Sequence, residues 1–179
     1  NPLVPGPNDL INSENLTEQL SNLTVAGLAA GALNPASASY EQTLADITSS
    51  IADSGKYLFN KKIDSSSLNI VQGDRAANLQ YAKSVSPIVR SVSENLGDQF
   101  DHILPDLNSI GAKGFDTNLK NYYASQASAL DGLFKEAVAL SVPKPFSAAH
   151  SALASLLYQM RNMDQAVAKG DTDVVKATL

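Results

Sequence analysis

The chain lacks cysteine and contains only two histidines. The absence of cysteine excludes disulfide bonds, thiolate-bound zinc, iron–sulfur clusters and a cysteine nucleophile. Two histidines are too few for a histidine-rich metal site. The sequence also lacks the G-x-S-x-G, G-x-x-x-x-G-K-[ST] and G-x-G-x-x-G motifs of hydrolases, P-loop proteins and dinucleotide-binding proteins. We therefore expect a protein that is not an enzyme and that uses no cofactor.

Positive charge is also scarce, with 13 Lys and Arg against 18 Asp and Glu, and residues 1–55 contain no Lys or Arg. Nucleic-acid binding needs clustered basic side chains to replace the counterions of phosphates, and the sequence shows no such cluster. The apolar run at 24–33 lacks the basic flank of a signal peptide, and it is shorter than the roughly 20 residues of a membrane span. We expect no nucleic-acid partner and no membrane span.

Hydrophobic residues make up 44% of the chain, a fraction typical of a globular domain. The polar remainder is mainly Ser, Asn, Thr and Gln, and the chain begins at Asn1 rather than at methionine. This composition, together with the absence of cysteine, favours a secreted bacterial protein whose leader has been removed. A cytosolic protein with the same composition is the alternative.

The first 13 residues contain Pro2, Pro5 and Pro7, which fix φ and remove donors, so we expect an extended arm there. The arm carries four apolar residues: Leu3, Val4, Leu10 and Ile11. If the arm packs on its own chain, it stabilises that chain. If it reaches a second copy of the chain, it forms an oligomer. The acidic first third and the slightly basic remainder would suit head-to-tail self-association.

From residue 14 onward, apolar residues recur every three or four positions, and no alternating pattern of a β-strand competes. The sequence predicts an all-α, up-and-down helical bundle of about five long helices and a short C-terminal helix, forming one domain over residues 14–179. The expected N-caps include Asp74, either Asp116 or Thr117, and Asp171. The third helix is expected to bend at Pro87 and to break near Pro105.

This third helix carries the longest apolar stripe, which we expect to face the core. Its members are Leu79, Ala82, Val85, Val89, Val92, Leu96, Phe100, Ile103, Leu107 and Ile110.

One acidic cluster on this helix is a candidate metal site. Glu94, Asp98 and His102 are spaced by four residues and share a helix face. The candidate ligands are Asp98, Asp101, His102 and Asp106. Pro105, four residues after Asp101, has no N–H, so the Asp101 carbonyl is free to act as a further ligand. The alternative is a solvated acidic face, which we favour because bundle metal sites draw ligands from several helices.

Two further positions have a structural and a functional interpretation. His150 lies beside the apolar stripe of its helix, where a hydrogen-bonded core histidine is commoner than a catalytic base. Tyr122 and Tyr123 could stack on a ligand. We favour one buried and one peripheral tyrosine, with a partner for each hydroxyl.

Residues 142–179 contain Pro143, His150 and a Gly-Asp turn at 170–171, with an apolar stripe in the helix that lies before the turn. This segment resembles the closing part of uncharacterised secreted helical proteins from small-genome candidate-phylum bacteria. The resemblance implies an extracytoplasmic all-α domain and carries no known activity.

These observations predict a non-enzymatic, extracytoplasmic structural or protein-interaction domain whose partner is another protein or a second copy of the chain. Such a module should expose a contiguous apolar patch. The alternative is a bundle that binds a small molecule or a divalent cation, which should contain a deep pocket with convergent polar groups.

Overall fold

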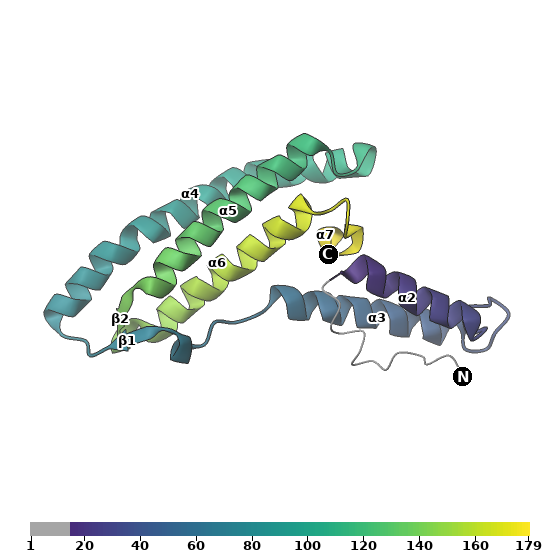
Figure 1. Cartoon of the computed structure of the whole chain (residues 1–179), viewed down its shortest axis with the longest axis horizontal. Helices are drawn as coiled ribbons and strands as arrows, with labels where there is room; N and C mark the ends of the chain where they lie inside the picture. Colours follow the sequence, from purple (N-terminus) through teal and green to yellow (C-terminus); the bar gives the residue numbers. More distant parts are fainter. Residues whose placement is uncertain (1–14) are drawn as a thin grey trace. The chain divides into compact units, whose positions relative to one another are not determined.

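The computed structural model describes residues 15–179, which are mostly α-helical (Figure 1). The prediction of an all-α protein built from up-and-down helices is confirmed. The extended arm predicted over residues 1–13 lies outside the described residues.

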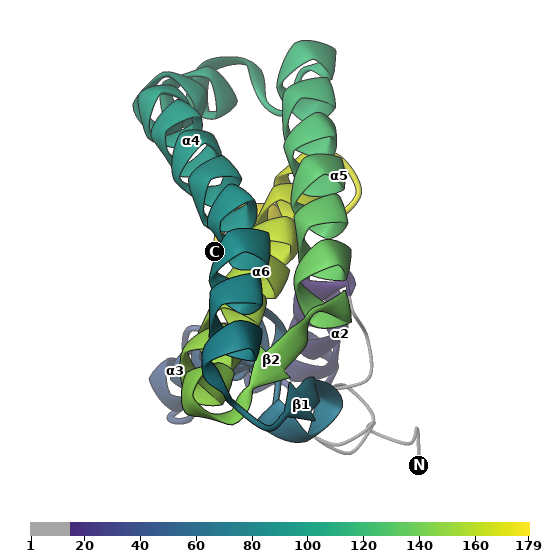
Figure 2. The same cartoon turned by 90° about the vertical axis from the view of Figure 1, so that its left-hand side faces the viewer.

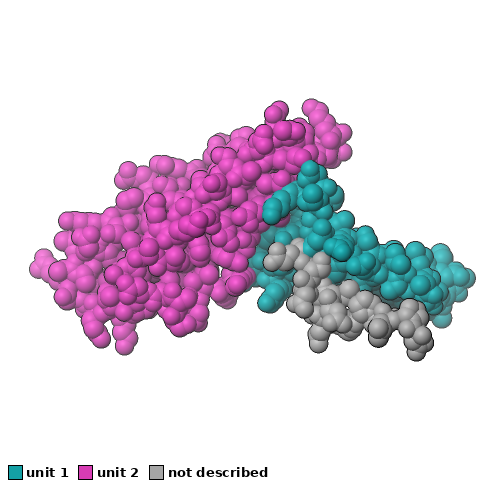
Figure 3. Space-filling model, in the orientation of Figure 1, with its two compact units in different colours: residues 1–60, 169–179 teal, residues 61–168 magenta. Residues whose placement is uncertain are grey.

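The helices form two compact units, coloured separately in Figure 3. Unit 1 comprises the described residues up to 60 together with 169–179, and unit 2 comprises 61–168. The expected single domain over residues 14–179 stays a prediction.

Unit 1 is built from α2 (Leu16–Ala29), α3 (Tyr40–Phe59) and the short α7 (Val174–Thr178). α2 packs against both α3 and α7. Gly31, with a φ of 73°, lies just after α2, where the chain turns toward α3. A left-handed conformation of this kind favours glycine because glycine has no Cβ.

The Asp173 carboxylate connects the C-terminal segment of unit 1 to the start of α2. Its Oδ2 accepts a hydrogen bond from the Leu16 amide at 2.9 Å. Its Oδ1 accepts from the Thr17 amide and from Thr17 Oγ1, both at 2.9 Å, and from the Lys176 amide at 3.2 Å. One buried side chain therefore caps the first turns of α2 and α7. The expectation that Asp171 caps the last helix is wrong, because α7 starts two residues later than predicted.

Unit 2 contains three long helices, α4 (Arg75–Lys113), α5 (Thr117–Ala139) and α6 (Ser147–Ala168), which run up, down and up (Figure 2). α5 and α6 make the most extensive contact. The core lies midway along them and consists of Ile88, Val92, Leu130, Ala137, Leu157 and Met160.

A short parallel sheet, which the sequence did not predict, closes one end of unit 2. β1 (Asn69–Val71) pairs with β2 (Ser141–Pro143), with Ile70 opposite Val142. Three residues are too few for a period-two pattern to be recognised. Two 3₁₀ turns, Ser65–Ser67 and Lys144–Phe146, lie beside the strands.

The expected cap residues of the long helices are confirmed. Asp74 accepts from the Ala77 amide at 2.7 Å, and Asp116 accepts from the Leu119 amide at 2.9 Å.

The predicted break of the third helix near Pro105 is wrong, because α4 continues to Lys113. Pro87 and Pro105 both lie at exposed positions. A proline on the solvent side removes one helical hydrogen bond, but water can hydrate the carbonyl that loses its partner. The helix can therefore continue past it.

Removing the shared cap should destabilise unit 1. We expect Asp173→Ala to lower the free energy of unfolding by about 2–4 kcal/mol, because two helix starts lose a charged acceptor. Urea unfolding followed by circular dichroism measures the change. Asp53→Ala is the control, since Asp53 forms only an exposed pair with Lys56 and should change stability by about 0.5 kcal/mol or less. Equal losses in the two variants would contradict this role of Asp173.

Candidate functional site

The acidic cluster on α4 faces two tyrosines of α5. Tyr122 Oη donates to Asp98 Oδ2 at 2.6 Å, and Gln126 Nε2 donates to the same oxygen at 3.0 Å. Tyr123 Oη donates to Asp106 Oδ2 at 2.9 Å. Burial is the main cause that raises the pKa of each tyrosine, and the hydrogen bond to the nearby carboxylate raises that pKa further. Both hydroxyls therefore remain donors at neutral pH.

His102 joins this cluster through its ring. The ring stacks on Tyr122 with 4.2 Å between centroids, and Nδ1 lies 3.8 Å from Asp106 Oδ2. Asp101 is exposed on α4. Of the four predicted metal ligands, the structure thus brings His102 and Asp106 together and directs Asp98 to α5.

Among residues 15–179, no group of three or more His, Asp or Glu side chains is placed to hold a metal ion. The carboxylates of Asp98 and Asp106 connect α4 to α5, a role that neither sequence interpretation included. The expected arrangement of Tyr122 and Tyr123 is confirmed: Tyr123 is buried, Tyr122 is partly exposed, and each hydroxyl has a partner.

Asp164 is a buried carboxyl that the sequence analysis missed. It lies on α6 and accepts a hydrogen bond from Gln99 Nε2 of α4 at 2.7 Å. Burial raises its pKa to about 7, and the Gln99 hydrogen bond opposes this shift only in part. A signal was present: Leu157, Met160 and Asp164 are spaced by three and four residues, which puts the acid on the core stripe.

His150 is a hydrogen-bonded core residue, as expected. Its Nε2 lies 3.0 Å from the carbonyl oxygen of Ala137, and its Nδ1 lies 3.0 Å from Tyr81 Oη. A carbonyl only accepts, so Nε2 carries the proton and Nδ1 accepts from the tyrosine. Both ring nitrogens are engaged inside the bundle, where the side chain is buried.

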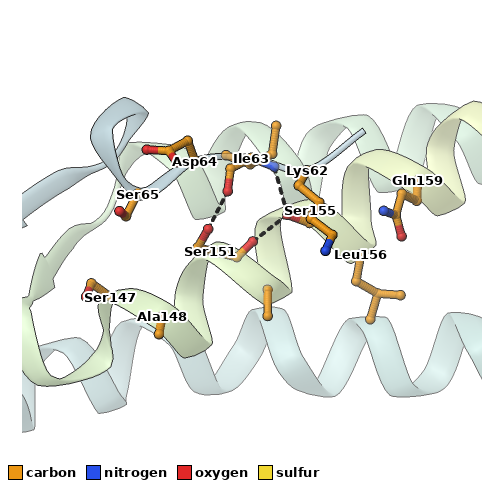
Figure 4. A pocket seen from close by; sticks show the side chains of 11 residues that line it. Lys62, Ile63, Asp64, Ser65, Ser147, Ala148, Ser151, Ser155, Leu156 and Gln159 are labelled. Carbon is orange, nitrogen blue, oxygen red and sulfur yellow. Dashed lines mark hydrogen bonds between the residues drawn. The ribbon is translucent and has the colours of Figure 1, made fainter. Parts of the chain in front are cut away.

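An open pocket of about 650 Å³ lies between residues 62–65 and the first half of α6 (Figure 4). Its wall is rich in serine, but the hydroxyls on α6 bond to the protein itself. Ser151 Oγ donates to the Ile63 carbonyl, and Ser155 Oγ accepts from the Ile63 amide at 2.8 Å and donates to the Ser151 carbonyl at 2.7 Å. These bonds attach the segment before β1 to α6.

The C-terminal half of α4 exposes a row of large apolar side chains, here called the α4 strip. The strip consists of Phe100, Ile103, Leu104 and Leu107, which are 72%, 42%, 71% and 60% exposed. Phe100, Ile103 and Leu107 were expected to face the core, and this prediction is wrong.

The length of α6 explains the exposure at the far end of the strip, at Leu107. α4 and α6 run in the same direction, and Gln99 contacts Asp164. Counting on from that contact, the end of α6 at Ala168 falls opposite Ile103. α4 continues for ten more residues, to Lys113, without α6 beside it. The apolar side of α4 beyond Ile103 therefore has no α6 residue opposite it, whereas Phe100 lies before this point and is exposed beside α6.

The part of α4 that carries the strip is acidic. Four acids lie on this part of α4: Glu94, Asp98, Asp101 and Asp106. No Lys or Arg occurs on α4 between Arg90 and Lys113. An apolar row between carboxylates can hold a partner by burial and by charge.

Comparison with known proteins returns no match: no family model, no curated protein and no solved structure matches the chain. Across residues 15–179, none of the helices is both long and apolar enough to cross a membrane.

The buried acid makes folding stability depend on pH. The unfolded state ionises Asp164 near its ordinary pKa of 3.8, whereas the folded state keeps the proton up to about pH 7. The burial of Asp164 therefore costs no stability below about pH 4, and its cost grows as the pH rises toward 7. We expect wild type to lose about 2–4 kcal/mol relative to Asp164→Asn across this window, measured by urea unfolding at a series of pH values.

Asp101→Asn is the matched control, because Asp101 is exposed on α4. Its difference from wild type should change little with pH. A stability difference between wild type and Asp164→Asn that stays constant from pH 4 to pH 7 would contradict the burial of an unstable charge at this position.

Proposed function

We propose that this protein is a non-enzymatic interaction domain that docks a partner protein on the α4 strip. The observation that carries the proposal is the exposure of four large apolar side chains at consecutive helix-face positions, Phe100, Ile103, Leu104 and Leu107. Soluble monomers rarely expose contiguous apolar patches of this kind without a binding role. Aromatic and aliphatic anchors at the centre of a patch supply most of the energy of an interface.

Two further observations favour binding over catalysis or small-molecule capture. Both nitrogens of His150 are used in the core, so this residue offers no free base. The hydroxyls of Ser151 and Ser155 in the open pocket are used by the Ile63 segment and by α6 itself. A small-molecule site needs polar groups that converge on the ligand instead.

The proposal includes an extracytoplasmic location. The cysteine-free, Ser-, Asn- and Thr-rich composition supports it, as does the resemblance of residues 142–179 to secreted helical proteins. A second copy of this chain is one of the partners that the experiment below can reveal.

Photo-crosslinking tests the docking face. We expect p-benzoylphenylalanine at position 104 to cross-link one protein saturably in an extract of the cells that produce this chain. The same group at position 79 should not, although Leu79 is also exposed on α4. Excess unlabelled wild type should compete, whereas excess Phe100→Glu should not, because a charge replaces the aromatic anchor.

Circular dichroism checks that Phe100→Glu folds, as an exposed side chain predicts. Equal cross-linking at positions 79 and 104, or equal competition by wild type and Phe100→Glu, would show that the α4 strip is not a docking face. A cross-link between two copies of the chain would identify the partner as the protein itself.

A further inference from the structure

We infer that the partner presents a basic amphipathic helix to the α4 strip. This inference rests on the proposed docking function and names the chemistry of the occupant. Three features of α4 carry it: the spacing of the strip, the use of its backbone, and the sign of the charges around it.

The spacing of the strip matches the period of a second helix. Phe100, Ile103, Leu104 and Leu107 occupy positions i, i+3, i+4 and i+7 of one helix face, about 10 Å from end to end. Two helices bury such rows by packing the ridges of one into the grooves of the other. An i, i+3, i+4, i+7 row is also the pattern of anchors by which one amphipathic helix engages an apolar surface of another protein.

The backbone of α4 offers little to an extended peptide. Strand addition needs a row of unpaired N–H and C=O groups, and the main-chain groups of α4 are engaged in its own helix. One exception lies beside the strip: Pro105 has no N–H, so the carbonyl of Asp101 lacks its helical donor. This carbonyl and the Asp101 carboxylate are both acceptors, which suits a Lys or Arg side chain rather than an acidic one.

The charges on both edges of the strip have one sign. Asp101 precedes Leu104 by three residues on one edge, and Asp106 follows Ile103 by three residues on the other. The exposed Glu94 extends the first edge, and the nearest basic residues on α4 lie outside the strip, at Arg90 and Lys113. An acidic flank attracts a basic partner and repels an acidic one, since like charges across an interface are costly.

Synthetic helices test this inference with the full chain. Three peptides of about 18 residues (five turns) share the same apolar i, i+3, i+4, i+7 face and carry Lys, Gln or Glu on its flanks. A fourth peptide has the Lys composition in scrambled order. Binding is measured by fluorescence anisotropy at low and high salt.

We expect the Lys peptide to bind about tenfold or more tightly than the Glu peptide, with a difference that shrinks as salt screens the exposed charges. The scrambled peptide should bind more weakly because it has no apolar face. Leu104→Ser should weaken the Lys peptide about fivefold or more, whereas Leu79→Ser should not. Asp101→Asn should weaken it about two- to fivefold, and the exposed Asp53→Asn in unit 1 should leave it unchanged.

Equal affinity for the Lys and Glu peptides, or tighter binding of the Gln peptide, would show that the partner helix is not basic. The cross-linking experiment would then decide separately whether the α4 strip is a docking face. The inference would also be overturned if Leu104→Ser left the affinity for the Lys peptide unchanged, or if the scrambled peptide bound as tightly as the Lys peptide. Either result would show nonspecific attraction to an acidic protein. If no peptide binds while cross-linking at position 104 succeeds, the basic helix is wrong and the docking face stands.

Discussion

The exposure at the far end of the α4 strip depends on a difference in length between two neighbouring helices. α4 has 39 residues and α6 has 22. Because the two helices run in the same direction and are in register at Gln99 and Asp164, α6 ends where the apolar row of α4 is still continuing. Leu107 at the far end of the row has no α6 residue opposite it and is exposed. Burying the whole row against another protein would contribute hydrophobic free energy to binding.

The same difference explains the chemistry of the α4–α5 contact. In the middle of unit 2, apolar side chains such as Ile88, Leu130 and Leu157 fill the core. Farther along α4, the apolar side faces the uncovered direction, so carboxylates connect α4 to α5 through Tyr122 and Tyr123. Hydrogen bonds to a charged acceptor contribute about 1.5–3 kcal/mol each, enough to hold a helix that has little apolar contact there.

The helices and several of their ends could be predicted from the sequence, because period and capping are local properties. Asp74 and Asp116 are caps in the structure for the reason that made them candidates. The exposure of Leu107 could not be predicted, since periodicity tells which face of a helix is apolar but not how far its partner extends. Asp173 was missed for a related reason: it caps α2 from the other end of the chain, and no local pattern encodes that contact.

Amide hydrogen exchange along α4 tests the central claim most directly. The account predicts that amides at 88–92, within the core, exchange only by extensive unfolding, whereas amides at 100–113 exchange much faster through local opening of an uncovered helix. Adding the Lys-flanked amphipathic helix should slow exchange at 100–113 and leave 88–92 unchanged. Uniform protection along α4 in the free protein, with no change at 100–113 on adding that helix, would contradict an uncovered docking face.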